Sequence, residues 1–293
     1  MTFRDWVKFI VLSLLWGSSF LWIKIAVQEI GPFTLVAFRI LFGLLGFLIF
    51  FLITRPALPS RAYIGPFALM GLFNITVPFV LISWSEKFIP SGMASVLNST
   101  TPLWAIVISP FFIAEDRLTV KKVLGLVLGF GGVVMLVSNQ LAGGVGNQAI
   151  APLTMLAATF CYAITAVYSR LKLAGLDPIA QTAGAFTGAA LAIVPSAMIV
   201  EAPFQLPQLP ITWLALAWLG LLGTFTAYML YYSLIHSIGP MRATSVTYVM
   251  ALVGVVLGIL FLSEPPDWRL FAGGALIIGG VMLVNQKKRE LAQ

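Results

Sequence analysis

Long apolar runs, separated by short polar or Pro- and Gly-containing breaks, extend along the whole chain. Each run holds about 20 residues, the length of an α-helix that crosses the hydrocarbon core of a bilayer. The pattern predicts an all-α integral membrane protein with ten transmembrane helices. Their expected bounds are Trp6–Ala26, Phe33–Ile53, Tyr63–Ser85, Pro90–Ala114, Val120–Ser138, Pro152–Ser169, Pro178–Val200, Thr212–Ile235, Pro240–Leu262 and Trp268–Asn285.

Composition supports the same class and excludes others. Hydrophobic residues make up 60% of the 293-residue chain and charged residues only 9%, whereas soluble domains carry about 25% charged residues. The chain has one cysteine, Cys161, and one histidine, His236. These cannot assemble a zinc, haem or iron–sulfur site or a disulfide within the chain. We expect no metal, no cofactor and no enzymatic activity, because no nucleophile or acid pair is predicted at membrane depth.

Basic residues gather on one side of the predicted membrane. With the N-terminus inside, 13 of the 17 Lys and Arg residues fall in the inner loops and termini. The positive-inside rule then predicts that both termini are cytoplasmic. We expect a multi-pass protein of a bacterial-type inner (plasma) membrane. The net charge of +7 therefore indicates contact with the lipid bilayer and not a nucleic-acid partner.

The chain repeats itself. Gly31-Pro32 matches Asp177-Pro178 at an offset of 146, and from Gly71 to Gly131 the offset is 149 without a gap. This register predicts two domains, residues 1–145 and 146–293, with five spans each. Because five is odd, the second copy must enter the membrane inverted. Inverted repeats around a central cavity are typical of secondary transporters that work by alternating access. A duplicated membrane scaffold without transport is the alternative.

Several segments resemble the EamA family of the drug/metabolite transporter superfamily. They are Leu15-Trp16-Gly17-Ser18-Ser19-Phe20 with Lys24, Pro32 with Arg39, Phe112-Ile113-Ala114-Glu115 with Gly125, and Phe261-Leu262-Ser263-Glu264-Pro265 with Gly274 and Gly280. The resemblance covers nearly the whole chain. It implies ten helices, duplicated five-helix halves and export or exchange of small metabolites. The family often has Pro in the ninth helix where this chain has Ala251. The second half is therefore expected to lack a kink that corresponds to the one at Pro102 in the first half.

Polar residues form stripes on the predicted helices. Ser95, Asn98 and Pro102 share a face of the fourth, and the repeat register matches Ser95 with Thr244 and Asn98 with Thr247. Polar groups inside a span must meet one another, the backbone or a water-filled cavity. We therefore expect the substrate to contact these stripes, although small residues there also suit close helix packing. The candidate substrate-binding residues are Trp16, Asn74, Pro78, Ser95, Asn98, Pro102, Tyr162, Thr224, Tyr231, Thr244, Thr247 and Tyr248.

Two prolines free a backbone acceptor beside an asparagine. Pro78 cannot donate to the carbonyl of Asn74, nor Pro102 to that of Asn98. Each site suits a polar substrate group or a water. The alternative is a kink whose free carbonyl is satisfied by a neighbouring Ser or Thr.

Four ionisable residues are expected to have structural or gating roles. Glu115 and Glu264 lie at helix ends and suit caps or loop pairings, and Lys24 suits snorkelling to the outer interface. Arg39 lies about two turns into its span, where burial of a charge is costly. We expect it to bind carbonyls or an acid such as Glu86 or Glu29, with attraction of an anionic group as the alternative.

All ten acidic residues are predicted at span ends or in loops. Proton-driven exporters of cations generally use a buried carboxylate. We therefore expect facilitated diffusion or exchange of a neutral or zwitterionic metabolite such as an amino acid, by a monomer. A drug or solvent exporter of the same fold and a non-transporting scaffold or sensor are the rival functions. A channel is disfavoured because no ring of charged residues can be assembled.

Overall fold

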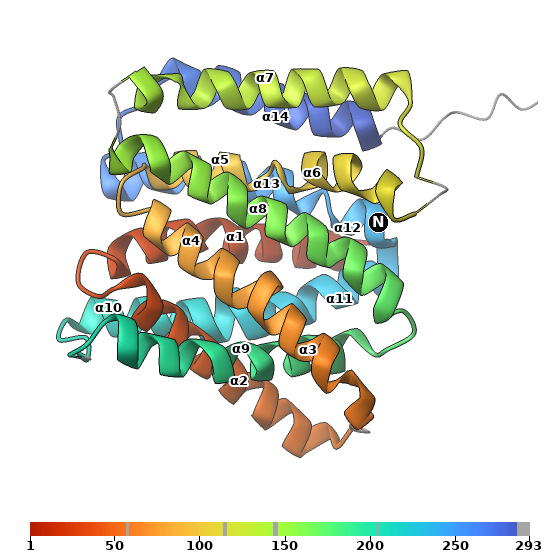
Figure 1. The fold of residues 1–293 in the computed structure, drawn as a ribbon, viewed down its shortest axis with the longest axis vertical. Coiled ribbons are helices and arrows are strands. Elements are labelled where there is room, and N and C mark those ends of the chain that lie inside the picture. Colours follow the sequence, from red (N-terminus) through yellow and green to blue (C-terminus); the bar gives the residue numbers. More distant parts are fainter. Residues whose placement is uncertain (57–58, 114–115, 143–145, 204, 286–293) are drawn as a thin grey trace, which may run out of the picture.

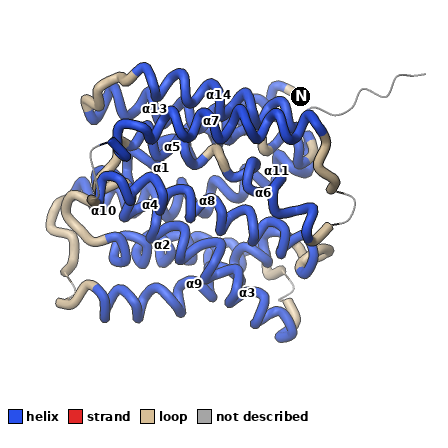
Figure 2. Tube along the Cα trace, turned by 45° about the horizontal axis from the view of Figure 1, so that its top comes forward, coloured by secondary structure: helices blue, strands red, loops and turns tan. Residues whose placement is uncertain are grey.

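The helices run alongside one another, and their connections gather at the two ends of the bundle (Figure 1 and Figure 2). The computed structural model describes residues 1–56, 59–113, 116–142, 146–203 and 205–285, and these contain helices and no strand. The α-helices are α1 (Phe3–Ala26), α2 (Pro32–Thr54), α3 (Ile64–Met70), α4 (Val77–Ser85), α5 (Ser91–Asn98), α6 (Thr101–Ile108), α7 (Val120–Ala142), α8 (Asn147–Lys172), α9 (Pro178–Val200), α10 (Pro210–Ala217), α11 (Ala227–Ile238), α12 (Pro240–Ala243), α13 (Val246–Leu262) and α14 (Trp268–Asn285).

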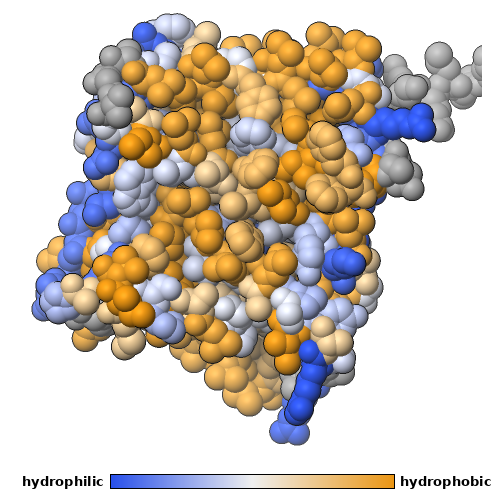
Figure 3. Space-filling view, in the orientation of Figure 1, coloured by the Kyte–Doolittle hydropathy of each residue, from blue (hydrophilic) through white to orange (hydrophobic). Residues whose placement is uncertain are grey.

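The outside of the bundle is apolar between its two ends. Figure 3 shows hydrophobic residues across the broad face and hydrophilic residues toward the left and right edges, where the helices end. Large exposed side chains such as Leu52, Leu191 and Leu260 would meet water unfavourably but suit lipid. Within the described residues, seven continuous helical stretches are long and apolar enough to cross a membrane. They are Phe3–Ala26, Pro32–Thr54, Arg61–Ser85, Val120–Leu141, Asn147–Lys172, Pro178–Val200 and Pro210–Ile238.

Some helices extend beyond their expected bounds. α1 begins at Phe3, where Thr2 and Asp5 form a reciprocal capping box. α7 continues to Ala142 and α8 begins at Asn147, so most of the expected loop between residues 139 and 150 is helical. The hydrophobic pattern did not reveal these ends because polar residues form them.

Two of the expected spans are interrupted. The fourth is divided at Ser99–Thr100 into α5 and α6, and the ninth at Thr244–Ser245 into α12 and α13. The first break precedes Pro102, whose ring cannot continue the hydrogen-bonding pattern. The helix α13 passes through Ala251 without interruption, as expected for a position without proline, but the chain breaks nearly two turns earlier instead.

Each half also contains a π-helical segment at a matching place. The segments are η2 (Gly71–Thr76), between α3 and α4, and η4 (Trp218–Thr226), between α10 and α11. The offset of 149 maps η2 onto residues 220–225, inside η4. Pro78 follows the first segment but Ala227 follows the second, so proline is not required for the π geometry. Such segments widen the helix and rotate the residues that follow.

The two halves touch reciprocally where backbone meets backbone. A Cβ on Gly71 would lie 2.4 Å from the amide nitrogen of Ala189 and 2.6 Å from the carbonyl oxygen of Ala185, both in α9. A Cβ on Gly220 would lie 2.7 Å from the carbonyl oxygen of Arg39 and 3.1 Å from the amide nitrogen of Gly43, both in α2. At the offset of 146, Arg39 and Gly43 correspond to Ala185 and Ala189. Each half therefore inserts the same glycine against the same helix of the other half.

Three carboxylates cap helices that are distant in sequence. Glu201 accepts from the backbone N–H groups of Phe33 and Thr34 at 2.9 and 2.8 Å, at the start of α2. Glu264 accepts from the N–H groups of Ser91 and Gly92 at 2.6 and 3.0 Å, at the start of α5. These groups have no partner within their own helix, and a negative charge also suits the helix dipole.

The third such carboxylate is Glu29. It accepts from the backbone N–H groups of Gln208 and Leu209 and from the hydroxyl of Thr212, at the start of α10. The hydrogen bond from Thr212 and those from the two N–H groups hold the pKa of Glu29 below its ordinary value. All three caps lie at the end of the bundle where α4 leads into α5, which we call the α4–α5 end.

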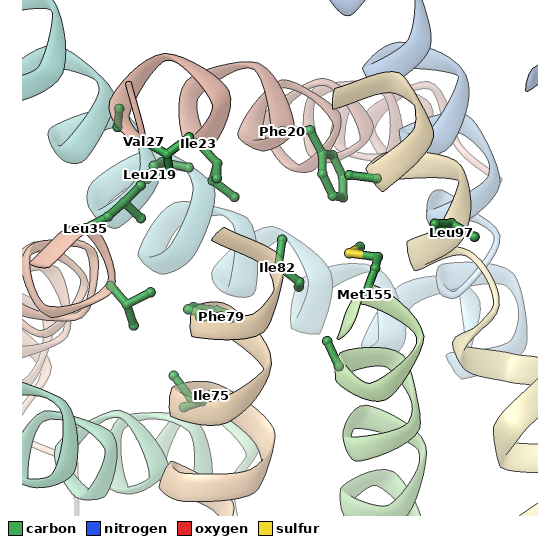
Figure 4. Close-up of a cluster of buried hydrophobic side chains, with 14 of the residues drawn as sticks. Phe20, Ile23, Val27, Leu35, Ile75, Phe79, Ile82, Leu97, Met155 and Leu219 are labelled. Carbon is green, nitrogen blue, oxygen red and sulfur yellow. The ribbon is translucent and has the colours of Figure 1, made fainter. Parts of the chain in front are cut away.

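Buried apolar side chains from three helices meet near the α4–α5 end. Phe20, Ile82 and Met155 gather there from α1, α4 and α8 and are buried (Figure 4). Toward the opposite end, Trp16 and Tyr231 keep partial exposure between the helices. The apolar contacts of α1, α4 and α8 close the interior between the three helices near the α4–α5 end.

The glycine contact between the halves can be tested by adding one methyl group. Gly71→Ala should destabilise the fold by about 1–3 kcal/mol, because the Cβ meets backbone that cannot rotate away. Gly131→Ala is the matched control, since a Cβ there has no neighbour within 4 Å. Thermal unfolding of the purified protein in detergent measures both. Equal melting temperatures for the two variants would contradict this account of the contact.

Candidate functional site

Aromatic side chains from four helices form a cluster in the centre of the bundle. Trp16 of α1 packs against Tyr228 and Tyr231 of α11, with ring centroids 6.0 and 5.2 Å apart. Phe186 of α9 lies edge-on to Tyr228 at 5.9 Å and to Phe79 of α4 at 6.5 Å. We call these five residues the aromatic cluster. It places the expected site residues Trp16 and Tyr231 in contact.

Arg39 brings a positive charge to this cluster. Its side chain is 8% exposed, its guanidinium lies 4.1 Å from the centroid of the Phe79 ring, and its Nε donates to the Thr224 hydroxyl at 3.3 Å. The ion pairs in the described residues are Arg170–Asp116 and Arg269–Asp267, so Arg39 has neither of the acid partners we expected. A buried cation over an aromatic face, with polar hydroxyls nearby, can attract an anionic group.

A hydrogen-bond network joins Asn74 to α8. The Thr165 hydroxyl lies 2.8 Å from the Oδ1 atom of Asn74 and 3.0 Å from the carbonyl oxygen of Tyr162. The ring of Tyr162 packs against the main apolar core. Asn74 and Tyr162 are thus joined through Thr165, beside Pro78, which is buried in the first turn of α4.

Asn98 is the polar residue at the break between α5 and α6. Its backbone carbonyl accepts from the Thr101 hydroxyl at 3.0 Å, so the acceptor freed by Pro102 has a neighbouring donor, as in the kink alternative. Its side-chain Oδ1 is buried and has no hydrogen-bond partner among the described residues. Ser95, one turn earlier, donates to the carbonyl of Ala251 at 3.1 Å in the contact between α5 and α13.

The matching residues of the second half lie around the break between α12 and α13. Thr247 donates its hydroxyl to the carbonyl of Thr244 at 2.8 Å. Thr244 is exposed, and Thr247 and Tyr248 are partly exposed. Both α5 and α13 pack against α1, which carries Trp16. The helices that begin or end at the two polar breaks therefore both contact the helix that carries Trp16.

Lys24, for which we expect snorkelling to the outer interface, lies at the α4–α5 end. Its ammonium donates to the carbonyls of Glu86 and Ile89 at 2.5 and 2.9 Å. It therefore satisfies backbone acceptors at the end of α4, which have no partner within that helix. Glu264 has a capping role, one of the two roles expected for it. Glu115 lies outside the described residues.

The sequence pattern did not reveal Phe79 and Tyr228, although both lie in the cluster. They are repeat mates at the offset of 149, and each follows directly after one of another pair of mates, the candidate residue Pro78 and Ala227. The polar stripes assume 3.6 residues per turn along the whole helix. Each π segment adds one residue, so the residues after it that face the centre are shifted by one position. The repeat register and this shift together could have identified them.

Comparison with known proteins shows the family. The model of the EamA-like transporter family matches residues 6–138 and 149–286. The chain belongs to the EamA-like transporter family. A protein of Escherichia coli named "Uncharacterized inner membrane transporter YedA" is 30% identical to this chain over 281 residues, covering 94% of this chain and 89% of that protein.

Other comparisons agree with this EamA membership. An "Uncharacterized transporter" of Archaeoglobus fulgidus is 26% identical over 289 residues, which are 97% of this chain and all of that protein. A solved structure described as "Crystal structure of protein" shares the fold, with a TM-score of 0.67 at 22% identity over 97% of this chain and 96% of that one. The protein is a multi-pass membrane protein of a transporter family.

The network at Asn74 gives this EamA protein a measurable structural interaction. Thr165→Val removes the donor to the Asn74 amide oxygen and should lower the free energy of unfolding by about 1–3 kcal/mol. Thr187→Val is the control, because the exposed Thr187 hydroxyl bonds only the carbonyl of Ala183 in its own helix. Denaturation in detergent compares them, and an equal loss in both variants would show that the Asn74 bond adds nothing.

Proposed function

We propose that this protein is a secondary transporter that exports or exchanges small organic metabolites by alternating access. The proposed architecture has ten spans, in two inverted five-helix repeats at residues 1–145 and 146–293, around a central cavity. Neutral or zwitterionic solutes such as amino acids are the proposed substrate class. The protein is proposed to act as a monomer in a bacterial-type inner membrane, with both termini in the cytoplasm.

The observation that carries this proposal is the reciprocal contact of Gly71 with α9 and Gly220 with α2. A contact that recurs when the halves are exchanged is what a two-fold relation between them produces. With five spans in each half, the axis of that relation lies in the membrane plane. Two similar halves of opposite orientation can exchange their conformations, which opens the centre first to one side and then to the other. The separate family matches to residues 6–138 and 149–286 also support a duplication.

The chemistry of the centre supports the substrate class. The aromatic rings can contact an apolar side chain or face an ammonium group. Arg39 can attract a carboxylate, and Asn98 and Thr247 can form hydrogen bonds. A centre with one group that attracts a carboxylate, and aromatic rings that can face an ammonium group, suits a zwitterion that carries an apolar side chain. Cationic drugs suit this centre less well, because its buried ionisable side chain is a cation.

The proposed orientation makes a direct topological prediction. Reporter fusions at the C-terminal residue Gln293 and near Arg117 should report a cytoplasmic location, because most Lys and Arg residues lie on that side. A fusion between Ala142 and Asn147, in the connection from α7 to α8, should report a periplasmic location. A cytoplasmic signal from that connection would contradict five spans in the first half.

Transport itself is tested by counterflow in proteoliposomes. Vesicles that hold a high concentration of an unlabelled amino acid should transiently accumulate the labelled amino acid, and the rate should saturate. Asn98→Ala should weaken apparent affinity by about five- to a hundredfold, because a hydrogen bond to substrate is worth about 1–3 kcal/mol. Asn147→Ala, an exposed asparagine at the start of α8, is the control.

The outcomes separate the rival functions. No counterflow of any solute in a metabolite screen would favour a scaffold or sensor, whereas preference for hydrophobic cations would favour a drug exporter. Flux without saturation would indicate a channel. Unchanged affinity and rate in both Asn98→Ala and Thr247→Ala would place the substrate away from the two helix breaks.

A further inference from the structure

Glu86 is a buried carboxyl group with no hydrogen-bond partner. It follows the last residue of α4 and is 0% exposed. Neither of its carboxyl oxygens has a hydrogen-bond partner among the described residues. An ionised carboxylate in such a place would carry a large desolvation cost without compensating bonds. The sequence placed Glu86 at a span end and gave no sign of this burial.

The charged neighbours of Glu86 compensate only part of that cost. Lys24 of α1 uses its ammonium for the backbone carbonyls of Glu86 and Ile89 and makes no ion pair with the carboxyl group. Arg39 of α2 and Glu264, before α14, act on Glu86 from further away and with opposite signs. The parts of α5 and α8 that lie at this end, residues 91–98 and 147–160, contain no ionisable side chain. Burial therefore raises the pKa of Glu86 well above its ordinary range, and Lys24 lowers it only in part.

Other carboxylates at the same end behave differently. Glu29, Glu201 and Glu264 each accept two or more hydrogen bonds from helix N-termini. In Glu29 those bonds lower the pKa of the carboxyl group. Glu86 is thus singled out by its lack of donors and not by its position along the membrane.

A cavity lies near Glu86 at the same end of the bundle. A cavity of about 530 Å³ at the α4–α5 end is lined by Lys24, Gln28, Glu29, Thr212 and Glu264, among others. Lys24, which lines the cavity, donates to the Glu86 backbone carbonyl, so one lining residue separates Glu86 from the cavity. A small movement of the end of α1 or α4 would connect Glu86 with this cavity. In the proposed orientation the cavity opens to the outside.

We propose that Glu86 is a proton-binding site that controls the outer gate, formed where α1, α4, α5 and α8 close together at the α4–α5 end. When the gate is open, outer water hydrates the carboxylate. When the gate closes, the carboxylate takes one proton from that water and is buried as the neutral acid. The inference rests on the proposed alternating access, and its ligand is a proton and not the transported solute.

The sign of the pH dependence follows from linkage. An acid whose pKa is higher in the closed state than in the open state favours closure at low pH. Below the ordinary pKa of about 4.3 both states hold the proton, and pH has no further effect. Above that value the ratio of open to closed protein rises with pH, by at most about tenfold per pH unit. The rise ends once the pH passes the raised pKa of Glu86 in the closed state. More alkaline outer solution therefore opens the gate.

Accessibility of a single thiol measures the gate without any substrate. Cys161→Ser removes the sole cysteine, and Ser83→Cys places a thiol one turn before Glu86, at a position that is 1% exposed and whose hydroxyl has no partner in the described residues. A membrane-impermeant maleimide is added outside right-side-out vesicles at several outer pH values. Each rate is divided by the rate for Gln28→Cys, an exposed position near the same cavity, to remove the pH dependence of thiol reactivity itself.

The normalised labelling rate should rise with outer pH. Adding Glu86→Gln, which is permanently neutral, should keep labelling slow and nearly independent of pH, whereas adding Glu29→Gln should leave the rise in place. Adding Lys24→Met removes the cation that favours the ionised form and should move the rise to higher pH. A flat profile with Glu86 intact, or an unchanged rise in both Glu86→Gln and Lys24→Met, would overturn the proposal. Because no solute is present, these results are independent of the counterflow tests.

Discussion

The structure depends on two places where the halves of the chain meet at van der Waals distance between backbones. Hydrophobic burial gives little force between helices in lipid, since the surrounding tails are as apolar as leucine. Close approach is then the main source of attraction, and it requires residues without a side chain. Gly71 against α9 and Gly220 against α2 satisfy this requirement. Their equivalence under exchange of the halves gives the bundle its symmetry.

Both glycines begin or lie within π segments, η2 and η4. The extra residue of each segment rotates the next helix, so that Phe79 and Tyr228 face the centre in place of Pro78 and Ala227. The packing that joins the halves and the geometry that aims the aromatic cluster therefore occupy the same stretch of helix. A change in the contact between the halves would therefore also move the rings around Trp16 and Arg39. This shared stretch of helix physically links gate movement to the proposed substrate site.

Polar groups at the helix ends and breaks fall into two kinds in this molecule. Glu29, Glu201 and Glu264 are paired with free N–H groups of distant helices, which ties connections to the helices they cap. Asn98 Oδ1 and the oxygens of Glu86 are buried without partners in the described residues. A fully satisfied group holds one arrangement, whereas an unsatisfied group is stabilised by a ligand, a proton or a change of conformation. In a transporter, groups of the second kind are expected to respond to a change in ligand or pH.

The sequence alone determined the class of protein, because about 20 apolar residues in a row and few charges allow only a membrane helix. It also predicts a duplication, through the gapless register around Gly71 and Gly220. It placed Trp16, Arg39 and Thr224 among the residues of interest. It could not show which faces meet, because a periodicity of 3.6 fails after each π segment. Nor could it distinguish Glu86 from Glu264, since both are acids at a helix end. Only the tertiary structure decides that backbone N–H groups surround one carboxylate and apolar side chains bury the other, because those neighbours come from helices far away in the chain.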